Sequence, residues 1–279
     1  MKQLSFIALT TFLLSSPLSA QTIAIQPLAK APVIDGNGSD WQDVKAGVIP
    51  LHKSIPNAKT TVTQVKLTAG IFGEEIFFYA EWADPTASLQ HKPFVWDDAQ
   101  QKYIEGSQRE DRFAMEFRMA GDYSTDWLSG KSFTADMWHW KAARSNPTGY
   151  ADDQRTIISQ DKLLRAYETK TGDGKPLYIL RPWDEGDMPY ITKRYSQKQE
   201  AIMPKYVINP EAKGSTMDIQ AKGAWRDGQW HLELKRKLNT GHDDDVVFVR
   251  GQSMPGGIAI FESSDNDDHA ISDVLDFQF

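Results

Sequence analysis

The stretch VKLTAGIFGEEIFFYAEW, residues 65–82, decides the fold class of this chain. Its first half alternates apolar residues with polar or small ones, and its second half is rich in aromatic residues. Gly73-Glu74-Glu75 separates the halves as a turn. Alternation with a period of two is typical of a strand with one buried face, and two such runs around a short turn indicate a hairpin. We therefore expect a β protein.

Strand patterns of the same kind recur outward from this hairpin. Asp227-Gly228 is a type I′ turn signal. One short helix is expected over residues 159–169, and residues 172–210 are interpreted as an extended excursion across the sandwich. Further strands are expected at 113–119, 219–225, 230–238, 246–249, 257–261 and 274–279. Many short strands separated by turns favour an all-β, immunoglobulin-like β-sandwich with few short helices.

Residues 1–20 have the organisation of a signal peptide. Lys2 gives a positive start, residues 4–14 form an apolar run, and Ala20 provides a small residue for cleavage. The run is shorter than the ~20 apolar residues that span a bilayer, and no later stretch approaches that length. We therefore expect export to the periplasm, no integral membrane segment, and a single mature domain over residues 21–279.

The composition limits the kinds of partner and chemistry. Asp and Glu number 38 against 31 Lys and Arg, which gives a formal net charge of −7. An acidic chain does not attract phosphate backbones, so no nucleic-acid partner is expected, whereas a basic protein partner is easier to accommodate. The chain has no Cys, which excludes disulfides, thiolate metal sites and Cys nucleophiles. Neither a Walker loop nor a nucleophile elbow is present.

Four segments carry a resemblance to a known family. They are ADMWHWKAARSNP at 135–147, GYADD at 149–153, WADPT at 82–86 and EDRFA at 110–114. In this order they resemble the haem-binding domain shared by the gamma subunit of ethylbenzene dehydrogenase and related cytochromes. The start of the domain, PVIDG at 32–36 and DW at 40–41, also resembles carbohydrate-binding modules of the family 9 type.

The resemblance implies a β-sandwich that holds one haem b and has six-coordinate iron. In that family the axial ligands are a Met and a Lys, whereas a similar sandwich in cellobiose dehydrogenase uses a Met and a His. Covalent haem attachment needs a C-x-x-C-H motif, which a chain without Cys lacks. Any haem is therefore expected to be non-covalent.

Three methionines are candidates for the axial sulfur. Met119 is preferred because it ends an expected strand just before Ala120-Gly121, where the backbone can approach a planar cofactor closely. Met137 adjoins the Trp-rich segment and is the alternative, while mid-strand Met115 fits the core better. All three also fit an ordinary role as gap-filling core side chains.

His269 is the expected second iron ligand. It follows the strand expected at 257–261 and stands in the place where the family carries its Lys. His139, inside the Trp-rich segment, is a rival, although it equally fits a hydrogen-bonded structural role. Lys235 and Lys237 are further alternatives on a strand face that reads as solvent-exposed. His52, His91, His231 and His242 read as surface residues.

The residues around His139 are expected to form the haem pocket. Trp138 and Trp140 offer apolar contact to a porphyrin, and Lys141 or Arg144 offers a cation to a propionate. An ordinary aromatic core with a surface Arg is the simpler interpretation. The acidic loops at 242–245 and 265–268 carry oxygens that suit calcium, and solvated loops or a docking face for a basic partner are the alternative.

These observations favour an electron carrier over an enzyme. Iron with two protein ligands has no open position for a substrate, so single-electron transfer is the expected role. The expected partner is a redox protein, either a c-type cytochrome or a molybdenum/iron–sulfur oxidoreductase. The alternative function is a carbohydrate-binding module of family 9 type, in which exposed Trp side chains stack on sugar rings.

Overall fold

The structure of the protein is a computed structural model that describes residues 20–265 and 268–279. Apart from Ala20, the expected signal peptide lies outside these residues, as do Asn266 and Asp267 of the second acidic loop. No helix in these two ranges is long and apolar enough to cross a membrane.

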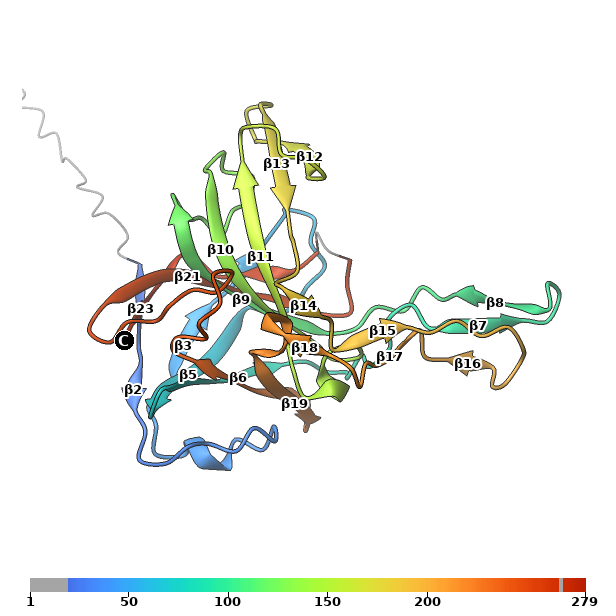
Figure 1. Ribbon diagram of the computed structural model, residues 1–279, viewed down its shortest axis with the longest axis horizontal. Coiled ribbons are helices and arrows are strands. Elements are labelled where there is room, and N and C mark those ends of the chain that lie inside the picture. The colour runs from blue at the N-terminus through green and yellow to red at the C-terminus, as the bar shows by residue number, and fades with distance from the viewer. Residues whose placement is uncertain (1–19, 266–267) are drawn as a thin grey trace, which may run out of the picture.

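Two sheets form the body of the molecule (Figure 1). The large sheet has the order β1 (Gln21–Ala24), β23 (Leu275–Gln278), β21 (Ser253–Phe261), β9 (Arg112–Gly121), β10 (Phe133–Lys141), β11 (Asp152–Ser159), β13 (Pro176–Leu180), β12 (Tyr167–Lys170), with β22 (Ala270–Ile271) and β4 (His52–Lys53) attached. The small sheet has the order β19 (Gln220–Arg226), β20 (Gln229–Lys237), β6 (Glu75–Ala83), β5 (Gln64–Phe72), β2 (Gln26–Pro27), with β3 (Gly47–Pro50) on β5.

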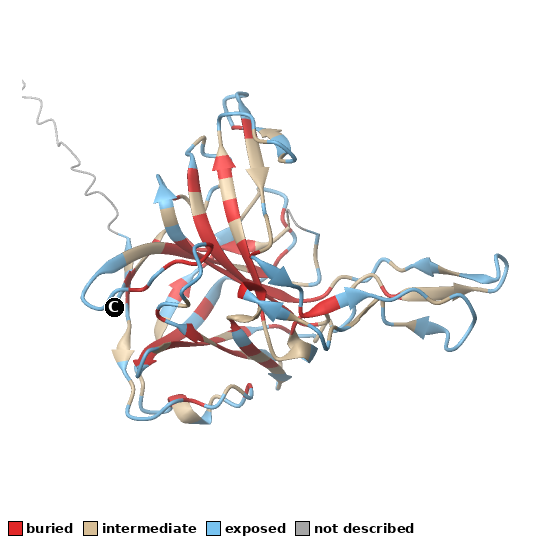
Figure 2. Cartoon of the chain, in the orientation of Figure 1, coloured by how far each residue is buried: buried red, intermediate tan, exposed pale blue. Residues whose placement is uncertain are grey.

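Aromatic side chains fill the space between the two sheets. The ring centroids of Phe78 in β6 and Trp138 in β10 are 5.7 Å apart. Those of Trp82 in β6 and Phe113 in β9 are also 5.7 Å apart. Figure 2 shows the buried residues concentrated on these central strands. Because large rings from both sheets share one core, the expected all-β sandwich is confirmed.

An arm projects from one side of the sandwich (Figure 1). It contains β7 (Phe94–Asp97), β8 (Lys102–Glu105), β16 (Ile202–Met203), β15 (Tyr190–Thr192) and β17 (Tyr206–Ile208), while β14 (Gly186–Asp187) and β18 (Lys213–Gly214) pair at its base. Residues 172–210 therefore do not run across the sandwich as expected. They add β13 to the large sheet and then leave it to pair with residues 94–105 in the arm.

Both predicted turns are present, although Glu75, expected in the first turn, already belongs to β6. Gly73 has a φ of 57° between β5 and β6, whose residues Ile71 and Ile76 pair. Asp227 and Gly228 have φ values of 53° and 79°, so both occupy the left-handed region that a type I′ turn requires.

Two local predictions are wrong. Residues 159–169 form no helix, because β11 continues to Ser159 and β12 begins at Tyr167. Leu164 in this segment is 86% exposed, so the segment lacks the apolar packing that stabilises most helices in proteins. Residues 246–249 are not a strand. Within residues 20–265 and 268–279, the short helices are the 3-10 turns η1 (Ser39–Trp41), η2 (Asn146–Thr148) and η3 (Ser215–Met217).

Glu233 departs from the expectation that its side of β20 faces solvent. It is buried, and Trp41 Nε1 donates to its Oε1 at 2.9 Å. The backbone N–H groups of Asp35 and Gly36 donate to its Oε2 at 2.9 and 2.7 Å. One carboxylate thus fixes the segment from Pro32 to Trp41 to the small sheet, which gives that motif a structural role.

Candidate functional site

Strand β10 divides its side chains between the two faces of the large sheet. Trp138 and Trp140 point into the core between the sheets. Met137, His139 and Lys141 alternate with them and therefore point to the opposite side, the outer face. The sequence-predicted residues 137–141 consequently do not line one common pocket.

The outer face is built from residues that pair across four strands. Ala259 of β21, Ala114 of β9, His139 of β10 and Asp152 of β11 form one row. Phe261, Arg112 and Lys141 form the next row. We call these seven residues the His139 face. A separate small apolar cluster contains Tyr123, Phe133, Ala135, Ile158 and Leu177.

His139 is the most unusual residue of this face. It is 4% exposed, and neither Nδ1 nor Nε2 has a hydrogen-bond partner among the residues that the structure describes. Burial, followed by the charges of Lys141, Arg112 and Arg144, holds the pKa of His139 well below its ordinary value. The imidazole is therefore neutral at physiological pH, and its lone pair is available to a metal.

Cationic side chains surround His139. The guanidinium of Arg112 lies 4.1 Å from the ring centre of Phe261. Lys141 Nζ contacts the Asp152 carboxylate and lies 3.5 Å from Tyr190 Oη. Burial lowers the pKa of Lys141 to about 8, although Asp152 opposes the shift. Arg144 pairs with the buried carboxylate of Glu110. The face is thus positive around a neutral imidazole.

The structure brings His269 to the same place. Its ring stacks on Phe261 with centroids 4.4 Å apart, and Phe261 also stacks on His139 at 5.7 Å. Two histidines that are 130 positions apart in the sequence therefore share one aromatic neighbour.

Met119 does not join this group. It packs against the main core from the inner face of β9, as do Met115 and Phe117. His269 and Met119, the ligand pair expected from the sequence, therefore lie on opposite faces of the sheet. Met137 does lie on the outer face, where Thr156 Oγ1 is 3.6 Å from its sulfur.

The remaining candidates lie elsewhere. Lys235 pairs with Glu75 on the small sheet at 2.9 Å, and Lys237 is exposed on the same strand. His52 and His242 are surface residues, with side chains 53% and 43% exposed. His91 is not, because its ring is 11% exposed beside Glu110. Burial and the neighbouring Arg144 lower the pKa of His91 to about 2.

Sequence reasoning assigned no role to Arg112 or Phe261. Arg112 belongs to the EDRFA segment, and Phe261 ends the strand expected at 257–261. Their position beside His139 depends on strand register between β21, β9 and β10, which no local pattern indicates.

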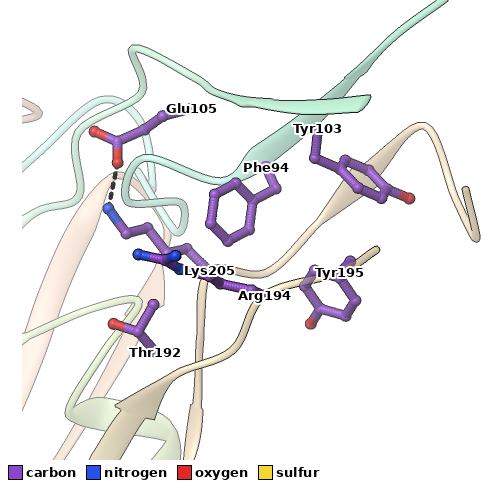
Figure 3. A pocket seen from close by; sticks show the side chains of 7 residues that line it. All are labelled: Phe94, Tyr103, Glu105, Thr192, Arg194, Tyr195 and Lys205. Atoms are coloured by element: carbon purple, nitrogen blue, oxygen red, sulfur yellow. Dashed lines mark hydrogen bonds and ion pairs between the residues drawn. The ribbon is translucent and has the colours of Figure 1, made fainter. Parts of the chain in front are cut away.

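The arm contains a separate hollow with a cavity volume of about 340 Å³ (Figure 3). None of the residues predicted as iron ligands lines this hollow. Its lining residues are Phe94, Tyr103, Glu105, Thr192, Arg194, Tyr195 and Lys205.

Comparisons with known proteins identify a family. The sequence profile described as ethylbenzene dehydrogenase matches residues 38–272, whereas no curated protein matches the chain. Among solved structures, the chain is similar to a family 9 carbohydrate-binding module from Caldicellulosiruptor kristjanssonii in complex with glucose. That similarity has 13% identity and a TM-score of 0.41, and covers 91% of this chain and 85% of the module. The module's cellotriose complex gives 12% identity, a TM-score of 0.37, and coverage of 91% and 84%. By its matched residues, the chain belongs to the ethylbenzene dehydrogenase family.

Proposed function

We propose that this protein is a periplasmic b-type cytochrome that carries single electrons through one non-covalent haem at the His139 face. The observation that carries the proposal is His139 itself. A buried polar group without a hydrogen bond costs about 1–3 kcal/mol, and this imidazole has two such nitrogens. Iron ligation would satisfy one of them, and a neutral imidazole is a common haem ligand.

The charges of the face also fit a haem. Haem carries two propionates, and Arg112, Lys141 and Arg144 surround His139. Charge-assisted hydrogen bonds from guanidinium groups to carboxylates are among the strongest in proteins. Arg112 and Arg144 would therefore hold the propionate edge, and Lys141 would add a third cation.

His139 and His269 would hold the haem iron, in place of the Met119 and His269 pair expected from the sequence. Both imidazoles stack on Phe261, so this ring is the side chain that a haem would displace. Met137, on the same outer face, is the alternative to His139. A haem held by two protein side chains would supply single-electron transfer and would leave no iron position open to a substrate.

The family supports a partner class. Membership of the ethylbenzene dehydrogenase family favours association with a molybdenum/iron–sulfur oxidoreductase, and a c-type cytochrome is the other candidate. The residue 1–20 pattern favours the periplasm as the compartment in which they meet.

A carbohydrate-binding module is the second candidate function, favoured by the hollow on the arm. Three aromatic side chains, Phe94, Tyr103 and Tyr195, line it beside Glu105 and Arg194 (Figure 3). Aromatic faces with polar neighbours suit sugar rings.

Haem titration tests the proposal. We expect the purified protein to bind one equivalent of hemin, with a Soret band and sharp reduced bands. Acidified organic solvent should extract all of this haem, because no Cys holds it. Saturable binding of glucose or cellotriose by calorimetry, without a stoichiometric Soret band, would support the second candidate instead.

A further inference from the structure

A group of carboxylates is buried on the opposite, inner face of β10 and β11. Asp136 of β10, Asp153 of β11 and Asp245 after β20 each place an oxygen within 4.8 Å of the others. All three are buried. Asp184 is also buried, and its N–H donates to the Asp153 carbonyl at 3.3 Å. We call these four residues the inner acid cluster.

Two guanidinium groups face the inner acid cluster. Arg236 Nη1 donates to Asp136 at 2.6 Å and to Asp245 at 2.7 Å. Arg155 Nε lies 3.4 Å from Asp184. Four carboxylates and two guanidinium groups leave two negative charges unbalanced, which is the charge that one divalent cation neutralises.

Several oxygens of the inner acid cluster are unused. Asp153 is fully buried, and within the described ranges neither of its oxygens has a hydrogen-bond partner. Asp136 Oδ1 is in the same condition, since Arg236 and the Val246 N–H both donate to Oδ2. Burying an unpaired carboxylate is strongly unfavourable, so these atoms need either a cation or a proton.

We propose that the inner acid cluster binds one hard divalent cation of the calcium type, with Asp136, Asp153 and Asp245 as ligands. Such cations take six to eight oxygen ligands, mainly carboxylates, carbonyls and water. The ligands come from β10, β11 and the loop after β20, so a bound cation would link these three segments.

A neighbouring group of acids does not compete for this role. Asp218 and His242 also approach Asp245, but His242 Nδ1 already lies 2.6 Å from Asp218 Oδ2. That hydrogen bond raises the pKa of His242 and favours its cationic form. A protonated imidazole repels a metal ion.

Terbium luminescence tests the proposal on the full-length protein after its metals are removed with EDTA. Trp138 pairs with Asp153 in the sheet, so it would sensitise Tb³⁺ held in the cluster. We expect saturable luminescence that Ca²⁺ abolishes by competition. Ca²⁺ at a hundredfold excess over its Kd should raise Tm by about 5–10 °C.

Asp153→Asn should weaken Ca²⁺ binding at least tenfold while raising Tm in EDTA, because it removes an unbalanced charge. Asp243→Asn, at an exposed acid in the loop that carries Asp245, should leave both quantities unchanged. If Asp153→Asn does not fold, the wild-type titration alone decides. Absence of both saturable luminescence and a Tm shift would overturn the proposal and assign protons to the cluster, in keeping with the pKa of Asp184, which burial raises to about 7.

Discussion

Strands β10 and β11 present two faces of opposite character. On the outer face, Lys141 and Arg112 lie near the neutral imidazole of His139. On the inner face, Asp136 and Asp153 gather with Asp245 around a deficit of positive charge. Because side chains alternate along a strand, neighbouring residues of β10 and β11 face environments of opposite charge. The proposed haem rests on the character of the outer face, and the proposed cation on that of the inner face.

Arg236→Met should have the largest effect, because it removes the main cation of the inner face. Arg236 Nη1 bonds both Asp136 and Asp245, and breaking a buried ion pair costs about 3–5 kcal/mol. Denaturant unfolding measures the loss. Arg250→Met, at a side chain that is 53% exposed, is the control and should change stability by less than about 0.5 kcal/mol. Equal losses of stability in the two variants would mean that Arg236 does not stabilise buried carboxylates on the inner face.

Asp153→Asn should change how stability depends on pH. In the metal-free protein, burial holds the pKa of Asp153 well above its ordinary value and raises that of Asp184 to about 7. The folded state then keeps protons that the unfolded state releases above about pH 4, so stability falls as pH rises from about 4 to 7. The variant should flatten this slope and be about 1–2 kcal/mol more stable at pH 7. Urea unfolding with EDTA across this range measures it, and an unchanged slope would contradict the burial of an unpaired Asp153.

Arg112→Gln should have the smallest effect, confined to the outer face. Losing one charged hydrogen bond to a propionate weakens haem affinity about tenfold, or about 1.4 kcal/mol. Arg118→Gln lies on the same strand at an exposed position and should bind haem as the wild type does. Hemin titration compares the variants, and identical affinities would place the propionates elsewhere.

The sequence predicted the local structure where one pattern dominates. The hairpin at 65–82 and the turn at Asp227-Gly228 follow from alternation and from residues that tolerate positive φ. The same alternation also implies that Trp138 and His139 face opposite sides of the sheet. The helix expected at 159–169 failed because its apolar residues have no core beside them.

The candidate site was harder to predict because both faces of β9 and β10 are buried. An apolar pattern then does not distinguish the core face from a ligand-binding face, and it does not show that Met119 packs against the core. The contacts of Phe261 with His139 and of Asp136 with Asp245 join residues more than 100 positions apart. They depend on strand order and register, which require the fold.

The visible absorption spectrum of haem-loaded His139→Ala, recorded beside wild type and Met119→Ala, tests the central claim most directly. We predict a six-coordinate low-spin haem in the wild type and in Met119→Ala, because Met119 packs in the core. His139→Ala should lose most of its haem or become high-spin. A low-spin spectrum and normal haem content in His139→Ala, or their loss in Met119→Ala alone, would contradict the assignment of the haem to the His139 face.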